Sequence, residues 1–412
     1  MPIVEFAALG ILVVTLVGLL WQPFGTKDWM WTIGAAGIVL AAGLLSIDNA
    51  ESTLASVSGV LLFLFGVAVV AELSSHAGVF QHAAFVVSSW AKGSQTRLFV
   101  WVLALTAFAT SIFSLDGAVV VMTPVVIHLA RIRGVQLLPL AFTVVFVANC
   151  GSLLFPMSNL TNLLAVEQLN WSFFYYTQMM WLPALLVLLT TAVVLWLWFR
   201  KDLVARYEPV EPPTSTDPAL RKIASVVCAI MLPSFFVAGL VGFGVEWIAL
   251  GAAFILAVVF LLRGNRAVDV AKTVPWQVLF FVIGLFLVVA AALDSGLSQQ
   301  VANTMARLSD PGLGGLLGSM GLATLLANLV NNLPAFLIIG PDVVGSQMSA
   351  VLVGVNAGPM LTPIGSLATV LWLHLLRRHE VATPSLRSIL TLGVVATPPI
   401  VLVGTLGVWL TV

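Results

Sequence analysis

The stretch that decides the fold is the polar segment NCGSLLFPMSNLTN at residues 149–162. It contains Gly and Pro, yet it lies between apolar runs long enough to cross a bilayer. Lipid cannot satisfy free backbone N–H and C=O groups, so irregular backbone at that depth is tolerated only inside protein or beside a water-filled cavity. The segment therefore predicts a break in a membrane helix and a binding site at the break.

A second copy of the pattern, NAGPMLTPIGSLAT, occupies residues 356–369. Asn149 aligns with Asn356 in this comparison. Pro156 likewise aligns with Pro363, and no gap is needed. Paired segments of this kind, interrupted by Gly and Pro in the two halves of a hydrophobic chain, point to a transporter's substrate site.

The composition predicts a polytopic membrane protein, since 60% of the residues are hydrophobic, 8% are charged and the mean hydropathy is +1.10. The two cysteines, Cys150 and Cys228, are too few for a disulfide framework or a zinc site. The chain has neither an HExxH metal motif nor a nucleotide-binding glycine loop, so an enzyme is not expected. No cofactor and no nucleic-acid partner is predicted.

A membrane helix needs about 20 apolar residues. Ten such spans are predicted, at 3–21, 29–47, 54–75, 136–166, 177–199, 222–242, 246–262, 274–293, 348–376 and 388–411, with 136–166 and 348–376 discontinuous. Two further apolar regions, 97–131 and 312–345, are broken near the middle by polar residues. We interpret them as re-entrant helical hairpins.

The predicted fold is an all-α membrane protein built from two five-helix repeats, each with one hairpin and one discontinuous helix. The first repeat covers 1–199, a cytoplasmic linker covers 200–221, and the second repeat covers 222–412. Five is an odd number of spans, so the second repeat is inverted. With both termini outside the cell membrane, this topology leaves only Arg307 among the Lys and Arg residues on the outer face, as the positive-inside rule favours.

The repeat extends to two other segments. Residues 110–118, which contain Asp116, match 327–335. Residues 62–66 resemble 280–284. The two halves thus correspond over the hairpins and over the helices that precede them.

Four polar elements are expected to meet near the bilayer midplane: the hairpin tips at 114–117 and 331–334, and the helix breaks at 158–162 and 365–369. A broken helix exposes N–H donors and C=O acceptors to a ligand. Small polar residues also cement helix packing in membranes, but the paired breaks favour a binding site. The predicted substrate-binding residues are Asn149, Ser158, Asn159, Thr161, Asn162, Asn331, Asn332, Asn356, Gly365, Ser366 and Thr369.

Asp116 is the one acidic residue placed deep in either hairpin. An ionisable group in the membrane is a functional candidate by default. Because desolvation penalises the charged form, we predict that Asp116 binds and releases a proton during transport, in preference to coordinating sodium or forming a structural pair. None of the four polar elements carries Lys or Arg, which favours a neutral, hydroxyl-rich solute. An anion stays open, because helix N-termini alone can hold a carboxylate.

At these residues the chain resembles the bacterial arsenite/antimonite efflux permeases (ArsB type) of the ion transporter superfamily. The motifs that carry the resemblance lie at 114–117, 156–162, 328–334, 356–359 and 365–372. The resemblance implies export of the trivalent hydroxides As(OH)3 and Sb(OH)3 in exchange for protons across the inner membrane. It also implies that a cytoplasmic arsenite-stimulated ATPase can act as a partner.

Two alternatives remain on the same fold. One is a sodium-coupled carrier for a dicarboxylate or another small anion, and the other is an exporter of a different neutral polyhydroxy solute such as silicic acid. The dicarboxylate branch is characterised by Ser–Asn–Thr triplets, from which residues 158–161 and 366–369 depart. Leu115 stands where many relatives carry Asn, while Asp116 is in place. These departures favour the metalloid branch.

Overall fold

The computed structural model of the chain describes residues 2–21, 25–204, 206–207, 217–265, 274, 276–310 and 312–411. These residues are helical apart from turns, loops and an isolated β-bridge between Ser94 and Arg206. Eight of their helices are long and apolar enough to cross a membrane, namely α4 (Ser58–His76), α6 (Gln95–Arg133), α9 (Phe173–Phe199), α10 (Pro218–Val241), α11 (Val245–Leu262), α13 (Trp276–Ala292), α15 (Leu313–Val330) and α19 (Leu386–Thr411).

The described residues form further helices besides these eight. They are α1 (Pro2–Trp21), α2 (Asp28–Ala41), α3 (Ile47–Ser56), α5 (Val79–Trp90), α7 (Leu137–Gly151), α8 (Leu160–Gln168), α14 (Ser298–Arg307), α16 (Asn332–Ile339), α17 (Gly345–Ala357) and α18 (Leu367–Arg378), with the short turns η2 (Pro156–Ser158), η3 (Leu293–Leu297), η4 (Gly340–Asp342) and η5 (Gly358–Leu361). The count of ten spans and the inverted orientation stay predictions. Residues 208–216 of the predicted linker lie outside the described residues.

Two predicted span boundaries differ from the structure. The predicted span 29–47 is occupied by α2 only as far as Ala41, because Gly43 adopts a φ of +67° and turns the chain. Ser46 then caps the polar helix α3, which the predicted spans 29–47 and 54–75 do not include as a separate helix. The predicted span 54–75 correspondingly begins at Ser58, in α4.

Helices of one half of the chain pack closely on helices of the other. α2 lies against α13, and α11 lies against α4. Each pair is held by a glycine: a Cβ on Gly66 of α4 would lie 2.7 Å from the backbone carbon of Ala249 in α11. A Cβ on Gly284 of α13 would lie 2.5 Å from the backbone carbon of Thr32 in α2. Gly66 and Gly284 are the aligned glycines of the matched segments, so both close approaches rest on equivalent positions.

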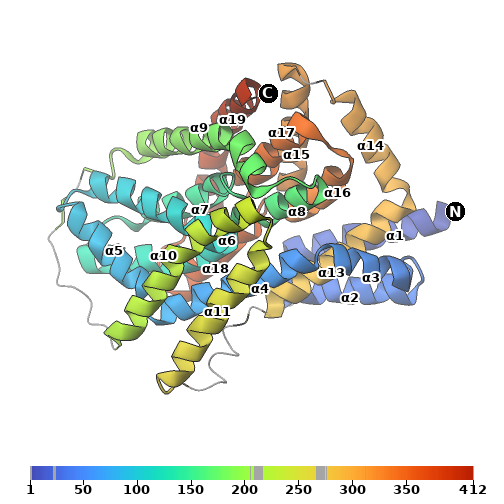
Figure 1. The fold of residues 1–412 in the computed structure, drawn as a ribbon. Helices are drawn as coiled ribbons and strands as arrows, with labels where there is room; N and C mark the ends of the chain where they lie inside the picture. The colour runs from blue at the N-terminus through green and yellow to red at the C-terminus, as the bar shows by residue number, and fades with distance from the viewer. Residues whose placement is uncertain are drawn as a thin grey trace.

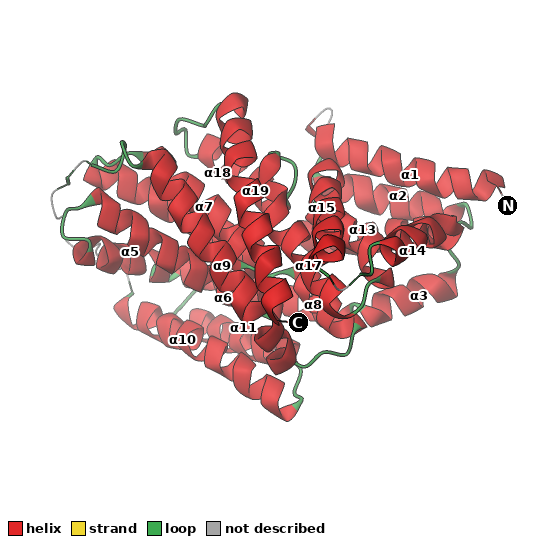
Figure 2. Cartoon of the chain, turned by 90° about the horizontal axis from the view of Figure 1, so that it is seen from above, coloured by secondary structure: helices red, strands yellow, loops and turns green. Residues whose placement is uncertain are grey.

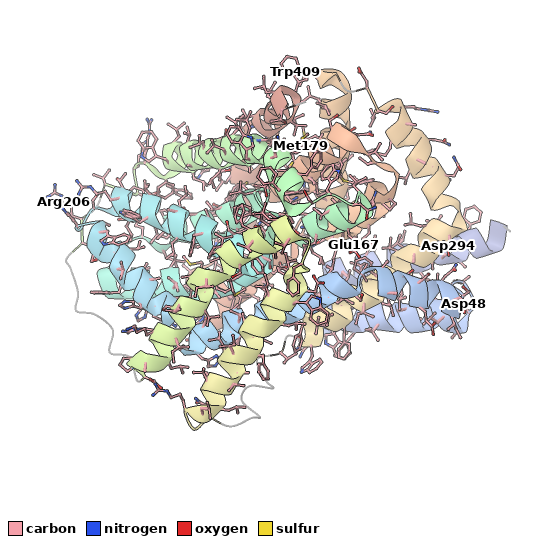
Figure 3. All side chains as sticks on the ribbon, viewed as in Figure 1. Asp48, Glu167, Met179, Arg206, Asp294 and Trp409 are labelled. Atoms are coloured by element: carbon pink, nitrogen blue, oxygen red, sulfur yellow. The ribbon has the colours of Figure 1, made fainter. Side chains whose placement is uncertain are left out.

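One end of the molecule is formed by α1, α2 and α3 together with α13, beside the N-terminus (Figures 1 and 2). Asn49 of α3 donates a hydrogen bond from Nδ2 to Oδ2 of Asp294 in η3, 3.0 Å away. Asp48 and Asp294 are both labelled at this end in Figure 3. In the middle of the molecule α6 packs on α7, and α9 packs on α19. The two interrupted segments, α7–η2–α8 and α17–η5–α18, lie within this central part.

Candidate functional site

The backbone leaves the helix at two matched positions. Ser114, within α6, has φ 63° and ψ 172°. Asn331, between α15 and α16, has φ 80° and ψ 155°. Residues other than glycine rarely adopt this region, at a cost of about 1–3 kcal/mol each, so such backbone is typical of functional sites. These are the tips that the sequence predicts, although the hairpin interpretation of 97–131 and 312–345 stays a prediction.

Each interrupted helix restarts at a side-chain cap. Asn159 caps α8, since its Oδ1 accepts a hydrogen bond from the backbone N–H of Thr161 at 3.3 Å. Ser366, the aligned residue, caps α18 in the same way through the N–H of Thr369, 3.2 Å from its Oγ. Caps of this kind satisfy N–H groups that a helix start leaves free. The polar residues at 159 and 366 thus have a local reason to stand where the helices resume.

Asn356 joins the second break to the first. Its Oδ1 accepts hydrogen bonds from Ser152 Oγ at 3.0 Å and from Asn159 Nδ2. Its Nδ2 donates to Oδ1 of Asn162 at 3.0 Å, and Asn162 in turn donates to the carbonyls of Ser152 and Phe155. All four polar side chains are buried. The predicted residues Asn159, Asn162 and Asn356 are therefore brought together as one network that holds the two halves of the chain in register.

The second break is held from α15. Asn328 donates from Nδ2 to the Gly358 carbonyl at 2.8 Å and accepts at Oδ1 from the N–H of Thr362 at 2.9 Å. The backbone N–H of Asn332 donates to the carbonyl of Gly365 at 2.9 Å. A Cβ on Gly365 would lie 2.3 Å from the Pro359 carbonyl oxygen, so only glycine fits there. The second tip and the second break thus touch through their main chains.

A cavity of about 30 Å³ lies where the tips and breaks meet. Its polar lining comprises Ser114, Asp116, Asn159, Asn331 and Asn332. The apolar lining includes aligned residues from the two halves, such as Phe63 with Phe281 and Leu160 with Leu367. We call it the central cavity. Four of the predicted site residues line it, at positions 116, 159, 331 and 332.

The remaining predicted residues do not line the central cavity. Asn149, Ser158, Thr161, Asn162, Asn356, Gly365, Ser366 and Thr369 stand around the breaks, most of them fully buried. Several of them carry the hydrogen bonds that shape the breaks. Their assignment as direct substrate ligands stays a prediction.

Some buried polar atoms of the predicted residues have no hydrogen-bond partner in the described part of the chain. Two of them belong to residues that line the central cavity, Asp116 Oδ1 and Asn331 Oδ1. Two others are Asn149 Oδ1 and Ser158 Oγ, beside the first break. An unsatisfied buried polar atom costs about 1–3 kcal/mol. The Oδ1 atoms of Asp116 and Asn331 are both acceptors, so the partners that they lack are hydrogen-bond donors such as hydroxyl groups.

Larger cavities flank the central one. The first, of about 330 Å³, reaches Glu167 and Glu246, and we call it the acidic vestibule. Glu167 stands at the end of α8 (Figure 3). Partial burial raises the pKa of Glu167 above its usual value, and the charge on Glu246 raises it further. A proton is therefore held more readily at Glu167 than on an isolated glutamate.

The second flanking space consists of two adjoining cavities of about 280 and 560 Å³. Both are lined by Phe281 and His374 of α13 and α18. One reaches Arg377 and the other Arg378, so we call them together the basic vestibule. Asp28 also lines both of these cavities. Glu167 on α8 and His374 on α18 occupy aligned positions, so the two vestibules meet equivalent half-helices at matched residues of different charge type.

The family model described as "Arsenical pump membrane protein" matches residues 7–412. The chain belongs to the arsenical pump membrane protein family. The arsenical pump membrane protein of Escherichia coli is 32% identical over 412 residues, covering 95% of this chain and 96% of the relative. That of Yersinia enterocolitica is 31% identical with the same coverage.

Among solved structures, the Alcanivorax borkumensis YdaH transporter shares the fold. The TM-score is 0.55 at 17% sequence identity, over 89% of this chain and 90% of that one. The fold of this arsenical pump family member is thus that of a membrane transporter.

Neither cysteine of this arsenical pump family member lines the central cavity. Cys150 on α7 and Cys228 on α10 are both free and buried, and Cys228 Sγ lies 3.2 Å from Ser74 Oγ. Within the described residues no three His, Cys, Asp or Glu side chains are grouped to hold a metal ion. Both thiols are buried as small, packed side chains.

Sequence reasoning missed several residues that shape the site in this family member. Ser152 bridges Asn149 and Asn356, and Asn328 holds Thr362. A signal existed for both, because Ser152 lies inside the opening polar segment and Asn328 is a polar residue in an apolar helix. Phe63 lies in the matched segment 62–66, but its uniformly apolar run does not show which side faces the cavity.

Proposed function

We propose that this chain exports trivalent arsenic and antimony hydroxides, As(OH)3 and Sb(OH)3, in exchange for protons. Membership of the arsenical pump family supports the cargo. The observation that carries the site is the central cavity, whose lining residues Asp116 and Asn331 each have a buried acceptor oxygen without a partner in the described part of the chain. A neutral trihydroxide brings three O–H donors, and none of the residues that line the cavity is Lys or Arg.

The exchange follows from competition at Asp116. As a carboxylate, Asp116 accepts a hydrogen bond from the hydroxide solute. When a proton occupies the same oxygen, that acceptor is lost, so the proton and the solute exclude one another. Release of the proton on the cytoplasmic side then favours loading, and protonation from outside favours release. One carboxylate therefore couples the outward path of the solute to the inward path of the proton.

Access alternates in this proposal because the chain is built of two inverted five-helix repeats, each with a re-entrant hairpin and a discontinuous helix. The pairs α2–α13 and α4–α11, closed by Gly284 and Gly66, serve as the fixed part. The tips and breaks move against it. Both termini lie on the extracytoplasmic side of the inner membrane. The basic vestibule with Arg377 and Arg378 opens to the cytoplasm. A cytoplasmic arsenite-stimulated ATPase is a partner in this proposal.

The test is arsenite uptake into everted membrane vesicles, driven first by an imposed pH gradient and then by a sodium gradient. We expect uptake with the pH gradient alone, and loss of that coupling in Asp116→Asn. Uptake that needs sodium would support the sodium-coupled carrier instead. Absence of arsenite movement under both gradients would refute the cargo, and dicarboxylates would be tried next.

A competition arm separates related neutral solutes. Antimonite should inhibit arsenite uptake, since both are trivalent hydroxides of similar shape. Silicic acid offers four hydroxyl donors to the same acceptors and is the matched comparison. Stronger inhibition by silicic acid than by antimonite would favour silicic acid as the exported solute.

A further inference from the structure

We propose that Phe63 and Phe281 are the two seals of the central cavity, Phe63 toward the acidic vestibule and Phe281 toward the basic vestibule. The proposal rests on the proposed alternating access and adds the residues that decide to which side the cavity is open. It assigns both rings to the fixed part of the molecule. The moving part opens or closes against them.

Phe63 stands between two cavities. It lines both the central cavity and the acidic vestibule. Its side chain is only 2% exposed. The ring packs against Phe235 of α10 with centroids 5.8 Å apart. Leu163 of α8 is the other residue that lines both spaces, so an aromatic ring from α4 and a leucine from the first break form the partition.

Phe281 has the same place on the other side. It lines the central cavity and both cavities of the basic vestibule, and its side chain is 6% exposed. Leu367 of α18 lines the same three spaces. Leu367 is the first residue of α18, within the second break. Asn331 and Val278 also line the central cavity and one cavity each of the basic vestibule. Each partition therefore includes a phenylalanine from a continuous helix and a leucine from a half-helix.

Each phenylalanine precedes a closely packed glycine by three residues. Gly66 follows Phe63, and Gly284 follows Phe281. These glycines bring α4 and α13 to within a backbone contact of α11 and α2. Residues three apart lie on neighbouring parts of a helix surface, so each ring is carried by a helix that is locked to its neighbour one turn away. The two leucines lie on half-helices that adjoin irregular backbone, where movement is less restricted.

The phenylalanine and the leucine make part of each partition apolar, and a narrow apolar constriction can exclude water because it dewets. Displacing Leu163 from Phe63 would join the central cavity to the acidic vestibule. Displacing Leu367 from Phe281 would join it to the basic vestibule. A carrier that opened both at once would leak protons, so the two contacts must break in turn.

The experiment measures the accessibility of a thiol in the central cavity. Leu115, which lines the cavity, is changed to Cys in a protein that also carries Cys150→Ala and Cys228→Ala. A membrane-impermeant thiol reagent is applied to right-side-out and to everted vesicles. We expect Phe63→Ala to raise the labelling rate by about tenfold in right-side-out vesicles only, and Phe281→Ala to raise it similarly in everted vesicles only.

The matched controls are Phe65→Ala and Phe280→Ala, which remove a ring from the same helices at positions that do not line the central cavity. They should leave labelling unchanged. Phe63→Leu and Phe281→Leu keep apolar bulk and should stay sealed. Where an alanine variant does not fold, Phe→Val at the same position removes enough of the ring for the same comparison.

The proposal is overturned if neither variant changes labelling, or if both raise it from the same side. Labelling needs no arsenite, so its outcome is separate from the cargo assignment. If wild-type vesicles fail to move arsenite but the two alanine variants each raise labelling from one side only, the proposed function is refuted and the role of the two phenylalanines as seals stands. If wild-type vesicles move arsenite but the variants show no one-sided labelling, the seals are refuted and the proposed function stands.

Discussion

The two breaks share a sequence pattern but differ in how their side chains are paired. At the first break, Ser152, Asn159 and Asn162 all bond to Asn356 from the other half. At the second break, Ser366 Oγ and Thr369 Oγ1 lie 3.1 Å apart and bond to each other. Asn149, which aligns with Asn356, donates only to the Val145 carbonyl within its own helix. Its Oδ1 is left without a partner in the described part of the chain.

The difference has a chemical origin in the residues themselves. Ser152 aligns with Pro359, which has no hydroxyl, and Thr161 aligns with Ala368. The second break therefore lacks two of the hydroxyl groups that the first break has. Backbone features are kept in both halves, whereas the polar side chains are kept only in part. The two halves thus share a backbone framework. They differ in the side-chain hydrogen bonds at the breaks, and these differences mark where the roles of the two halves diverge.

The largest effect is expected from Asn356→Ala. The change leaves Asn159 Nδ2 and Asn162 Oδ1 buried without this partner, at about 1–3 kcal/mol each, so the melting temperature in detergent should fall steeply and transport should be lost. Asn149→Ala is the control at the aligned position and should cost about 1 kcal/mol, because it removes one local hydrogen bond. Equal losses of stability in Asn356→Ala and Asn149→Ala would show that the two asparagines contribute equally to the breaks.

The second effect concerns the tips, where Asp116 aligns with Leu333. Asp116→Leu gives the first tip the residue of the second. We expect arsenite transport to fall by about 100-fold, while the melting temperature stays the same or rises, since a buried carboxylate with an unpaired oxygen is removed. A stability loss that parallels the transport loss would instead give Asp116 a structural role.

A smaller effect is expected where the tips are alike. Ser114→Gly relieves a backbone conformation that costs about 1–3 kcal/mol, so thermal stability in detergent should rise by about 1 kcal/mol. Asn331→Gly should gain less, because its Nδ2 also donates to the Ile364 carbonyl at 3.2 Å. Ser111→Gly, inside the preceding helical leg, is the matched control and should lower stability.

The smallest effect is expected in the acidic vestibule. The folded state raises the pKa of Glu167, so the stability linked to its proton is present below the ordinary glutamate pKa and is lost as the pH rises through the raised pKa. The melting temperature of Glu167→Gln should therefore be about 1 °C above that of the wild type at pH 8 and equal to it near pH 4. Glu51→Gln, at an exposed position on α3, should show no such difference.

The sequence was most informative where a residue type acts on its own backbone. Gly, Pro and the polar cap residues located both breaks, and Asp116 was found as a carboxylate in an apolar region. It was least informative where the outcome depends on tertiary contacts. The pairing of Ser152 with Asn356 joins residues 204 apart, and no local pattern shows it. Phe63 lies in an apolar run in which every residue suits a membrane helix, so the side that faces the cavity was hidden.

The end of α2 illustrates a further limit. Apolar residues continue past Ala41, so the hydropathy pattern extended the span to 47. Gly43, with its positive φ, ends the helix instead. A single glycine among apolar residues is a weak signal in membrane helices, where glycine is common.

Asp116 is the one titratable residue that lines the central cavity, and this has an energetic consequence. In the proposed exchange the solute leaves as a neutral molecule while a proton enters, so each cycle carries one positive charge inward. The membrane voltage then drives export as well as the pH difference, contributing about 2.3 kcal/mol for every 100 mV. Such a carrier would keep working in a cell whose interior and surroundings have the same pH.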